Sequence, residues 1–229
     1  MKETIVITGT SRGLGYELAN YLVLNSYNVI GLSRKKGRAS SFDSYKNFKF
    51  YRCDLSNISS IFKITQKISK EYKAIDVLIN NSAKFSMSAD KDISDKKLLN
   101  NFQTNVIGTI ILTRNLIKFN HKSLKKIFNI LSVSGLNAQL NQAIYSSTKH
   151  ALKGYFDSLM QENINKRNII NFYPGGIKTE LWDGIKINKN TVKKFMSPKH
   201  VAEYILKHLD IPDDIHIKEI TFFPKNDWH

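Results

Sequence analysis

The chain has 229 residues, of which 41% are hydrophobic and 24% are charged, a composition typical of a globular protein with its own core. Its single cysteine, Cys53, excludes an internal disulfide framework and a four-cysteine zinc site, and we expect no metal site. The formal net charge of +16 would suit a nucleic acid or a membrane surface, but the basic residues are scattered. We therefore interpret the charge as a compositional bias whose field attracts anionic small molecules.

Short β-rich runs alternate with longer segments of helical periodicity along the chain. Thr4–Thr8 predicts a buried strand, and the apolar stripe in Gly13–Asn25 predicts the helix that follows it. The first half also predicts strands at Asn28–Ser33, Phe48–Cys53 and Ile75–Ile79, a basic loop at Lys35–Ser44 and a helix at Ile58–Tyr72. The second half predicts helices at Asp95–Phe119, Tyr145–Asn165 and Pro198–Leu209, and strands at Lys126–Leu131, Ile169–Tyr173 and Ile217–Phe223.

This alternation is typical of an α/β fold, a doubly wound parallel sheet of about seven strands with right-handed crossovers and helices on both faces. No linker or repeat divides the chain, so we expect one domain over residues 1–229. Met1–Ile7 lacks the long apolar run of a signal peptide, and the longest apolar stretch, Val106–Leu112, is too short to cross a bilayer. With the lone thiol, these features favour a cytoplasmic protein without a membrane partner.

A glycine-rich turn, GTSRGLG from Gly9 to Gly15, connects the first predicted strand directly to the first helix. Glycines at such a junction permit a tight turn, a close approach of backbone to a pyrophosphate and close packing of helix on strand. The free N–H groups of the helix N-terminus also favour an anion. A plain β–α turn is the alternative, but the position at the first strand–helix junction favours dinucleotide binding.

The end of the second predicted strand bears on which dinucleotide is bound. A site for NAD usually places a carboxylate there for the ribose hydroxyls, whereas this strand ends in Ser33 and Arg34. A carboxylate would repel the additional phosphate of NADP, while a hydroxyl can donate to it and a guanidinium can pair with it. Lys35, Lys36 and Arg38 lie nearby, although they could be ordinary solvated residues. The pattern predicts NADP(H).

Tyr145 and Lys149 are four residues apart in a predicted helix, a spacing that places both on one face. A tyrosine with its ordinary pKa of about 10 is a poor proton donor or base near neutral pH. A neighbouring cation favours the phenolate and lowers that pKa toward the working range. Such pairs also occur by chance on helix surfaces, so this pair gains meaning only from its context.

Three motifs together resemble the short-chain dehydrogenase/reductase family, in its short single-domain branch. They are Thr-Gly-x-x-x-Gly-x-Gly at Thr8–Gly15, Asn80-Asn81 after the fourth predicted strand, and Tyr-x-x-x-Lys at 145–149. The resemblance extends by motif to about residue 179 and implies a Rossmann-type fold. It implies a catalytic group of four residues, Asn105, Ser132, Tyr145 and Lys149. Ser134 is an alternative for the catalytic hydroxyl, at a spacing that fits less well.

The family's chemistry implies a role for each of these residues when NADPH reduces a carbonyl group. Tyr145 would give a proton to the carbonyl oxygen, and Ser132 would hydrogen-bond that oxygen. Lys149 would bind the nicotinamide ribose and lower the pKa of Tyr145. Asn105 would hold a water that links Lys149 to solvent, through a helix irregularity near Gly108.

The resemblance also assigns residues to the cofactor. Asp54 would bond the adenine amine, and Thr179 with the backbone near Ile177 would bond the nicotinamide carboxamide. Ser82 and Ala83 depart from the family's Asn-Asn-Ala-Gly, which adds a Cβ where the backbone passes the ribose. The implied cofactor-binding residues are Gly9, Ser11, Arg12, Gly13, Leu14, Gly15, Ser33, Arg34, Asp54, Leu55, Asn81, Ser82, Ala83, Tyr145, Lys149, Pro174, Gly175, Ile177 and Thr179.

We expect a substrate lid at about 175–197, where Leu181 and Trp182 would offer apolar contacts, and Phe85 could also reach the site. The segment before Tyr145 contains four polar residues, Asn137, Gln139, Asn141 and Gln142. These favour a polar, sugar-like or 3-oxoacyl substrate. The chain lacks the glycine-rich ending of carrier-protein reductases, which weakens the last option.

We therefore predict an NADP(H)-dependent oxidoreductase that transfers hydride between a nicotinamide and a carbonyl or secondary alcohol. The long helices resemble those that pair between subunits in the family, so we expect a homodimer or homotetramer. A non-catalytic NADP(H)-sensing regulator on the same fold is the alternative, but such proteins commonly lack the Tyr or the Lys. A nucleic-acid-binding module rests on charge alone, without a recognised motif.

Overall fold

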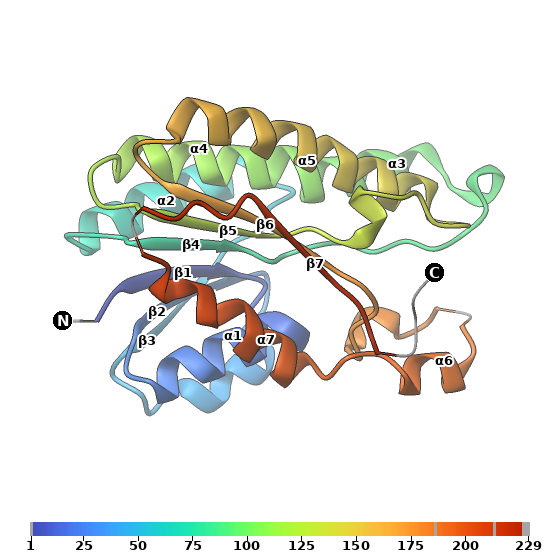
Figure 1. Ribbon diagram of the computed structural model, residues 1–229, viewed down its shortest axis with the longest axis horizontal. Helices are drawn as coiled ribbons and strands as arrows, with labels where there is room; N and C mark the ends of the chain where they lie inside the picture. The colour runs from blue at the N-terminus through green and yellow to red at the C-terminus, as the bar shows by residue number, and fades with distance from the viewer. Residues whose placement is uncertain (1, 186, 213, 226–229) are drawn as a thin grey trace.

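The structure is a computed structural model that describes residues 2–185, 187–212 and 214–225. Its seven strands form one parallel sheet in the order β3-β2-β1-β4-β5-β6-β7 (Figure 1). The strands are β1 (Thr4–Thr8), β2 (Asn28–Ser33), β3 (Phe48–Arg52), β4 (Val77–Asn80), β5 (Lys126–Ile130), β6 (Asn168–Pro174) and β7 (Glu219–Phe222). The helices are α1 (Gly13–Leu24), α2 (Ile58–Glu71), α3 (Asp95–Phe102), α4 (Thr109–Phe119), α5 (Ala143–Asn163), α6 (Lys189–Lys193) and α7 (Pro198–Leu206). The predicted doubly wound α/β fold is confirmed.

Helices cover both faces of the sheet because its central strands are apolar on both faces. In β1, Ile5 and Ile7 pack in the core beneath α1 and α7, while Val6 between them belongs to the core beneath α2, α4 and α5 (Figure 1). All three side chains are fully buried, and full burial of such a side chain stabilises the fold by about 1.5–3 kcal/mol. The chain order reverses between β1 and β4, so the carboxyl ends of these two strands flank the topological switch point where ligands bind in such sheets.

The predicted long helix Asp95–Phe119 is interrupted. A π-helical turn, Gln103–Gly108, separates α3 from α4. Gly108 ends this turn against the loop after β3, where a Cβ would clash with the carbonyl oxygen of Leu55. The irregularity expected near Gly108 is therefore confirmed, and glycine is needed there for close packing.

The prediction of a loop at Lys35–Ser44 is wrong in one respect, because the segment contains a 3₁₀ helix at Gly37–Phe42. Phe42 is buried and stacks on the ring of Tyr16 in α1, with 5.0 Å between the ring centroids. A single apolar anchor therefore orders a segment whose composition is otherwise polar.

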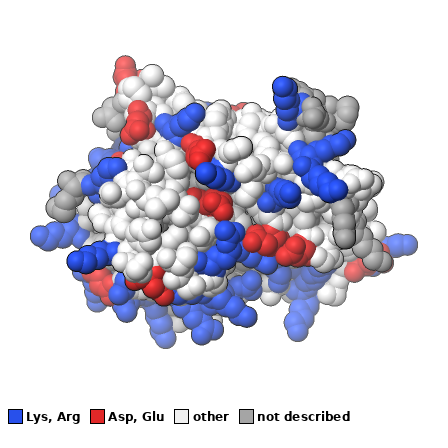
Figure 2. All heavy atoms as spheres, turned by 90° about the horizontal axis from the view of Figure 1, so that it is seen from below, with Lys and Arg blue, Asp and Glu red and all other residues white. Residues whose placement is uncertain are grey.

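Charged side chains are spread over the surface. On the face in Figure 2, Lys and Arg lie scattered over the view and its edges, with acidic side chains among them. In the part of the chain that is described, no helix is long and apolar enough to cross a membrane.

Candidate active site

The predicted site residues follow the carboxyl ends of six neighbouring strands, which a parallel sheet brings to one edge. Gly9 follows β1, Arg34 follows β2, Asp54 follows β3, Asn81 follows β4, Ser132 follows β5 and Gly175 follows β6. The helix α5 then adds Tyr145 and Lys149 from its first turns.

The glycine-rich turn lies at the switch point and is built on close approaches of the backbone. Gly9 has a φ of 81°, in the left-handed region that favours glycine. A Cβ on Gly15 would clash with the carbonyl oxygen of Gly9, so only glycine lets α1 approach β1 this closely. Within the described residues, α1 has neither a side-chain cap at Arg12 nor an acidic residue in its first turn, which leaves its N–H groups available to an anion. The side chain of Leu14 is buried in the core, so only its backbone faces the turn.

Two cations lie in the turns that follow the first two strands, Arg12 after β1 and Arg34 after β2. Arg34 and Arg12 are both exposed, and neither forms an ion pair with a described residue. Ser33, in contrast, is buried and donates its hydroxyl to the carbonyl oxygen of Lys35 at 2.6 Å. Arg38 lies 3.9 Å from the centroid of a tyrosine ring of α1 and pairs with two carboxylates. The Ser33 hydroxyl is therefore engaged with the backbone, whereas the exposed guanidinium groups of Arg12 and Arg34 remain accessible to a ligand.

The carboxylate of Asp54 is held ionised by its neighbours. Its Oδ1 accepts hydrogen bonds from the backbone N–H and the hydroxyl of Ser56, at 2.9 and 2.7 Å. Burial opposes ionisation, but these bonds and the charges of Arg34 and Arg52 hold the pKa of Asp54 below its ordinary value. The neighbouring Leu55 is buried beneath the π-helical turn, so its side chain does not face solvent.

The loop after β4 folds back onto β1. The backbone N–H groups of Asn81 and Ser82 both donate to Thr8 Oγ1, at 2.9 and 3.0 Å, and Asn81 Nδ2 donates to the carbonyl oxygen of Thr8 at 2.9 Å. These bonds fix the loop beside the glycine-rich turn. Ala83, which departs from the family's glycine, is half-buried in the loop that these bonds anchor.

Tyr145 and Lys149 project from α5 toward the end of β5. They are nearly inaccessible, with 6% and 2% of their surfaces exposed. Lys149 Nζ donates to the carbonyl oxygen of Ile130 at 3.0 Å and lies 5.5 Å from the centroid of the Tyr145 ring. An ammonium group has three N–H donors, so two remain for ribose hydroxyls.

Of the two candidate hydroxyls, that of Ser132 is the one that acts on the phenol of Tyr145, in the direction that lowers its pKa. Ser132 Oγ accepts from the backbone N–H of Ser134 at 3.1 Å, so its own proton can be donated to the phenol oxygen or to a ligand. Ser134 is buried, and its hydroxyl is bonded to Gln142 Oε1 at 3.0 Å. The geometry thus favours the first of the two candidate hydroxyls.

Burial dominates the ionisation of the Tyr145–Lys149 pair. It raises the pKa of Tyr145 above its ordinary value of 10, although the hydrogen bond with Ser132 acts in the opposite direction. It also lowers the pKa of Lys149 from 10.5 to about 7. The expected lowering of the Tyr145 pKa by Lys149 is therefore wrong for this structure, because desolvation outweighs the neighbouring amine. At neutral pH the phenol is protonated, as a proton donor must be.

Asn105 lies in the π-helical turn and joins it to the loop after β4. Its side-chain Oδ1 accepts from the backbone N–H of Lys84 at 2.7 Å, and its Nδ2 donates to the carbonyl oxygen of Lys84 at 2.8 Å and to Thr148 Oγ1 at 3.2 Å. The amide is thus occupied by protein groups.

The predicted lid, 175–197, returns from β6 to the glycine-rich turn. A Cβ on Gly13 would lie 3.3 Å from Cβ of Thr179, so the two segments are in close contact. The lid is closed on itself by a parallel bridge between Ile177 and Met196. Thr179 is therefore held beside the first turn of α1.

Four aromatic rings form a continuous row that starts at the candidate proton donor. Phe85 meets Tyr145 edge to face, with 4.8 Å between centroids and an interplanar angle of 83°. The ring of Trp182 lies 5.0 Å from that of Phe85, and the ring of Phe195 lies 5.0 Å from that of Trp182. We call these four residues the aromatic row. Sequence reasoning found Phe85 and Trp182 but missed Phe195, because it lies in an aperiodic segment and is brought in only by the bridge within the lid.

The four polar residues before Tyr145 do not contact the phenol. Asn137, Gln139 and Asn141 are exposed, and Gln139 Nε2 donates to the backbone of Asn137 at 3.2 Å. Gln142 is bonded to Ser134, as described above. Aromatic rings, rather than these polar groups, lie against the candidate proton donor.

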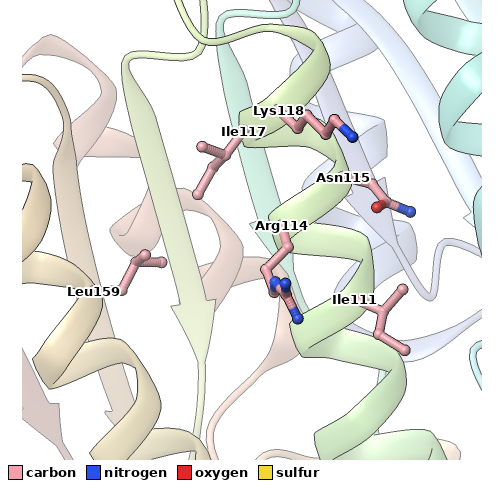
Figure 3. Close-up of a pocket in the computed structure, with 6 residues that line it drawn as sticks. All are labelled: Ile111, Arg114, Asn115, Ile117, Lys118 and Leu159. Atoms are coloured by element: carbon pink, nitrogen blue, oxygen red, sulfur yellow. The ribbon is translucent and has the colours of Figure 1, made fainter.

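A separate pocket of about 450 Å³ lies on the helical layer between α4 and α5 (Figure 3). It is lined by Ile111, Arg114, Asn115, Ile117, Lys118 and Leu159. None of these six residues belongs to the predicted catalytic or cofactor-binding set.

This chain is similar in sequence and in fold to known proteins. Residues 3–190 match the family model for short chain dehydrogenases. The NADP-dependent 3-hydroxy acid dehydrogenase of Schizosaccharomyces pombe is 28% identical, over 98% of this chain and 93% of its own. Among solved structures, ElxO with NADP bound has a TM-score of 0.86 and 26% identity over 98% of both chains. 4-Hydroxyisoleucine dehydrogenase complexed with NADH has a TM-score of 0.88 and 25% identity, over 97% of this chain and 98% of that one.

Proposed function

This chain belongs to the short-chain dehydrogenase family of NAD(P)-dependent oxidoreductases, and we propose that it is an NADP(H)-dependent carbonyl reductase. The observation that supports this proposal most strongly is the buried Tyr145, protonated at neutral pH and adjacent to Ser132 and Lys149. The proposed catalytic unit is a single domain, residues 1–229, with a lid at about 175–197.

The bound nicotinamide would supply the hydride, and the residues of this chain would do the remaining work. Tyr145 gives its proton to the carbonyl oxygen as negative charge develops there, and Ser132 Oγ donates a hydrogen bond to the same oxygen. Lys149 holds the ribose hydroxyls, and its charge offsets that of the phenolate left behind. Asn105 acts as a positioning residue, because it ties the loop after β4 to the helix that carries Lys149.

The strand ends have the shape and charge that a dinucleotide requires. The glycine-rich turn and the uncapped start of α1 suit the pyrophosphate, and the ionised Asp54 suits the adenine amine. Thr179 suits the carboxamide, since its hydroxyl accepts from the backbone N–H of Leu181 and keeps its proton for a ligand. Arg12 and Arg34 favour NADP(H) over NAD(H).

Arg34→Asp is expected to weaken the use of NADPH selectively. The change removes a phosphate partner and adds a carboxylate that repels the phosphate, a loss of about 3 kcal/mol or roughly a hundredfold in kcat/KM. The kcat/KM with NADH should stay the same or rise, because a carboxylate at position 34 can accept hydrogen bonds from the ribose hydroxyls. Steady-state kinetics with both cofactors measure the effect. Lys46→Asp makes the same change of charge on an exposed residue before β3 and should alter neither value. A wild-type preference for NADH would contradict the assignment.

We also propose that α4 and α5 pair between subunits to form a homodimer, on which a homotetramer could be built. The pocket in Figure 3 lies on this helical face, and Ile107, in the π-helical turn before α4, is 40% exposed. Ile111→Asp would bury a charge in such an interface and is expected to give monomers by light scattering. Ile164→Asp at the end of α5, on a side chain that is 61% exposed, is the control that should stay dimeric. A strictly monomeric wild type would contradict the proposed pairing of α4 and α5, but it would not affect the proposed reductase activity.

The reductase proposal is tested by following the reduced-nicotinamide absorbance while a panel of ketones is added to the protein with NADPH. Consumption of NADPH that depends on both protein and ketone is expected. Tight binding of NADPH without consumption by any ketone would instead indicate the sensing regulator.

A further inference from the structure

We propose that the aromatic row makes this site selective for ketones that carry a flat apolar group, such as aryl ketones, over sugar-like or carboxylated ketones. The inference rests on the proposed function, because it takes Tyr145 as the group that donates a proton to the carbonyl oxygen. Its basis is the contact of Tyr145 with Phe85 and of Phe85 with Trp182.

Phe85 lies where a substituent of the carbonyl group must pass. A carbonyl oxygen within hydrogen-bond distance of the Tyr145 hydroxyl places its carbon, and the two groups on that carbon, beside the phenol. The ring of Phe85 covers the edge of that phenol, with 4.8 Å between the centroids. One of the two groups on the carbonyl carbon therefore meets an aromatic wall, and edge-to-face or offset contact with such a wall favours a flat ring.

The opposite part of the wall is held in place by bonds within the lid. Trp182 Nε1 donates to the carbonyl oxygen of Ile177 at 2.9 Å, so the indole presents its apolar surface and offers a ligand no free donor. Phe195 packs on Gly176, where a Cβ would clash with its ring. A wall fixed in this way has less side-chain entropy to lose when a ligand binds, and it selects by shape.

The nearest cation in sequence to Phe85 and the exposed polar residues before Tyr145 bond to other groups or face solvent. Lys84, which precedes Phe85, donates its ammonium to Asn100 Oδ1 at 2.6 Å, toward α3. Asn137, Gln139 and Asn141 are exposed in their own loop. A carboxylate or a polyhydroxylated chain that entered beside Phe85 would lose water without gaining a charged partner from these residues.

The test compares ketones that differ in one property at a time. Acetophenone and cyclohexyl methyl ketone have similar size, but only the first is flat; pyruvate and dihydroxyacetone supply a charge and hydroxyl groups. With NADPH, kcat/KM for acetophenone is expected to exceed each of the others at least tenfold. Phe85→Leu and Trp182→Leu should each reduce the preference for acetophenone over cyclohexyl methyl ketone at least fivefold, and Phe85→Leu should do so with the Kd for NADPH unchanged. Phe62→Leu, which removes a half-exposed ring on α2, should leave the preference intact.

A binding measurement separates this inference from the function on which it rests. The chain has two tryptophans, so Trp228→Phe makes Trp182 the sole indole reporter. With NADPH present, saturable quenching of its fluorescence by acetophenone, but not by pyruvate, would support the aromatic row as a binding surface. Absence of saturable quenching, or turnover that favours pyruvate or dihydroxyacetone, would overturn the inference and leave a reductase of other specificity. Saturable quenching without any turnover would uphold the inference and contradict the reductase.

Discussion

Tyr145→Phe is expected to reduce ketone turnover by roughly a thousandfold, within the 10²–10⁴ that a positioned proton donor contributes. The substitution removes one oxygen and retains the ring that meets Phe85, so the site keeps its packing. NADPH should therefore bind with nearly unchanged Kd, while kcat falls. Single-turnover kinetics and a separate titration with NADPH measure the two quantities.

The matched control for this variant lies on the same helix. Tyr155 also belongs to α5, and its hydroxyl is buried without a hydrogen-bond partner among the described residues. Tyr155→Phe removes that hydroxyl far from the catalytic group and should retain full turnover. Full activity in Tyr145→Phe would contradict Tyr145 as the proton donor, although the chain would still belong to the family.

Lys149→Met is expected to stabilise the free protein while it abolishes most turnover. Burial lowers the pKa of Lys149 from 10.5 to about 7, which corresponds to roughly 4 kcal/mol of lost stability at pH 7. Methionine fills a similar volume without a charge, and loss of the bond to the Ile130 carbonyl offsets about 1 kcal/mol of the gain. We expect a net increase of about 2–3 kcal/mol in the free energy of unfolding at pH 7, measured by chemical denaturation.

The pH dependence of the free energy of unfolding tests whether the gain in Lys149→Met comes from the buried charge of Lys149. Between pH 7 and 10.5 the unfolded chain holds a proton on Lys149 that the folded chain has largely lost, so this group makes the wild type more stable as pH rises. The advantage of Lys149→Met should therefore shrink as pH approaches 10. Lys153→Met, one turn further along α5, removes an ion pair with Asp157 that raises the pKa of Lys153, and it should bring no gain. A Lys149→Met protein less stable than the wild type at pH 7 would contradict burial as the cause.

The order of strands and helices could be predicted because each element has a local pattern of apolar and polar residues. In β1, three consecutive apolar residues divide between two cores, and such a run indicates a strand covered on both faces. The strand-end residues followed from topology, since a parallel sheet gathers them at one edge. The segment Gly37–Phe42 could not be predicted in this way, because its helix depends on the stacking of Phe42 on Tyr16 from another element.

The sequence predicted which residues form the candidate site, but it did not predict their pKa values. The spacing of Tyr145 and Lys149 placed both on one face of a helix, yet their pKa values follow from burial, which no spacing reports. The polar residues before Tyr145 suggested a polar substrate, whereas the rings of Phe85 and Trp182 occupy the wall beside the phenol. Side-chain direction in loops, unlike position in a strand or helix, depends on contacts that are distant in sequence.

In the proposed reaction, Tyr145 protonates a carbonyl group while hydride arrives from a bound nicotinamide. The most direct measurement uses NADPH deuterated at the transferable position, a panel of ketones and mass spectrometry of the alcohol products. We expect the wild type to form an alcohol that carries deuterium on its carbinol carbon, and Tyr145→Phe to form it roughly a thousandfold more slowly. Recovery of every ketone unchanged by a wild-type protein that binds NADPH would contradict it, as would equal rates of deuterium transfer by the two proteins.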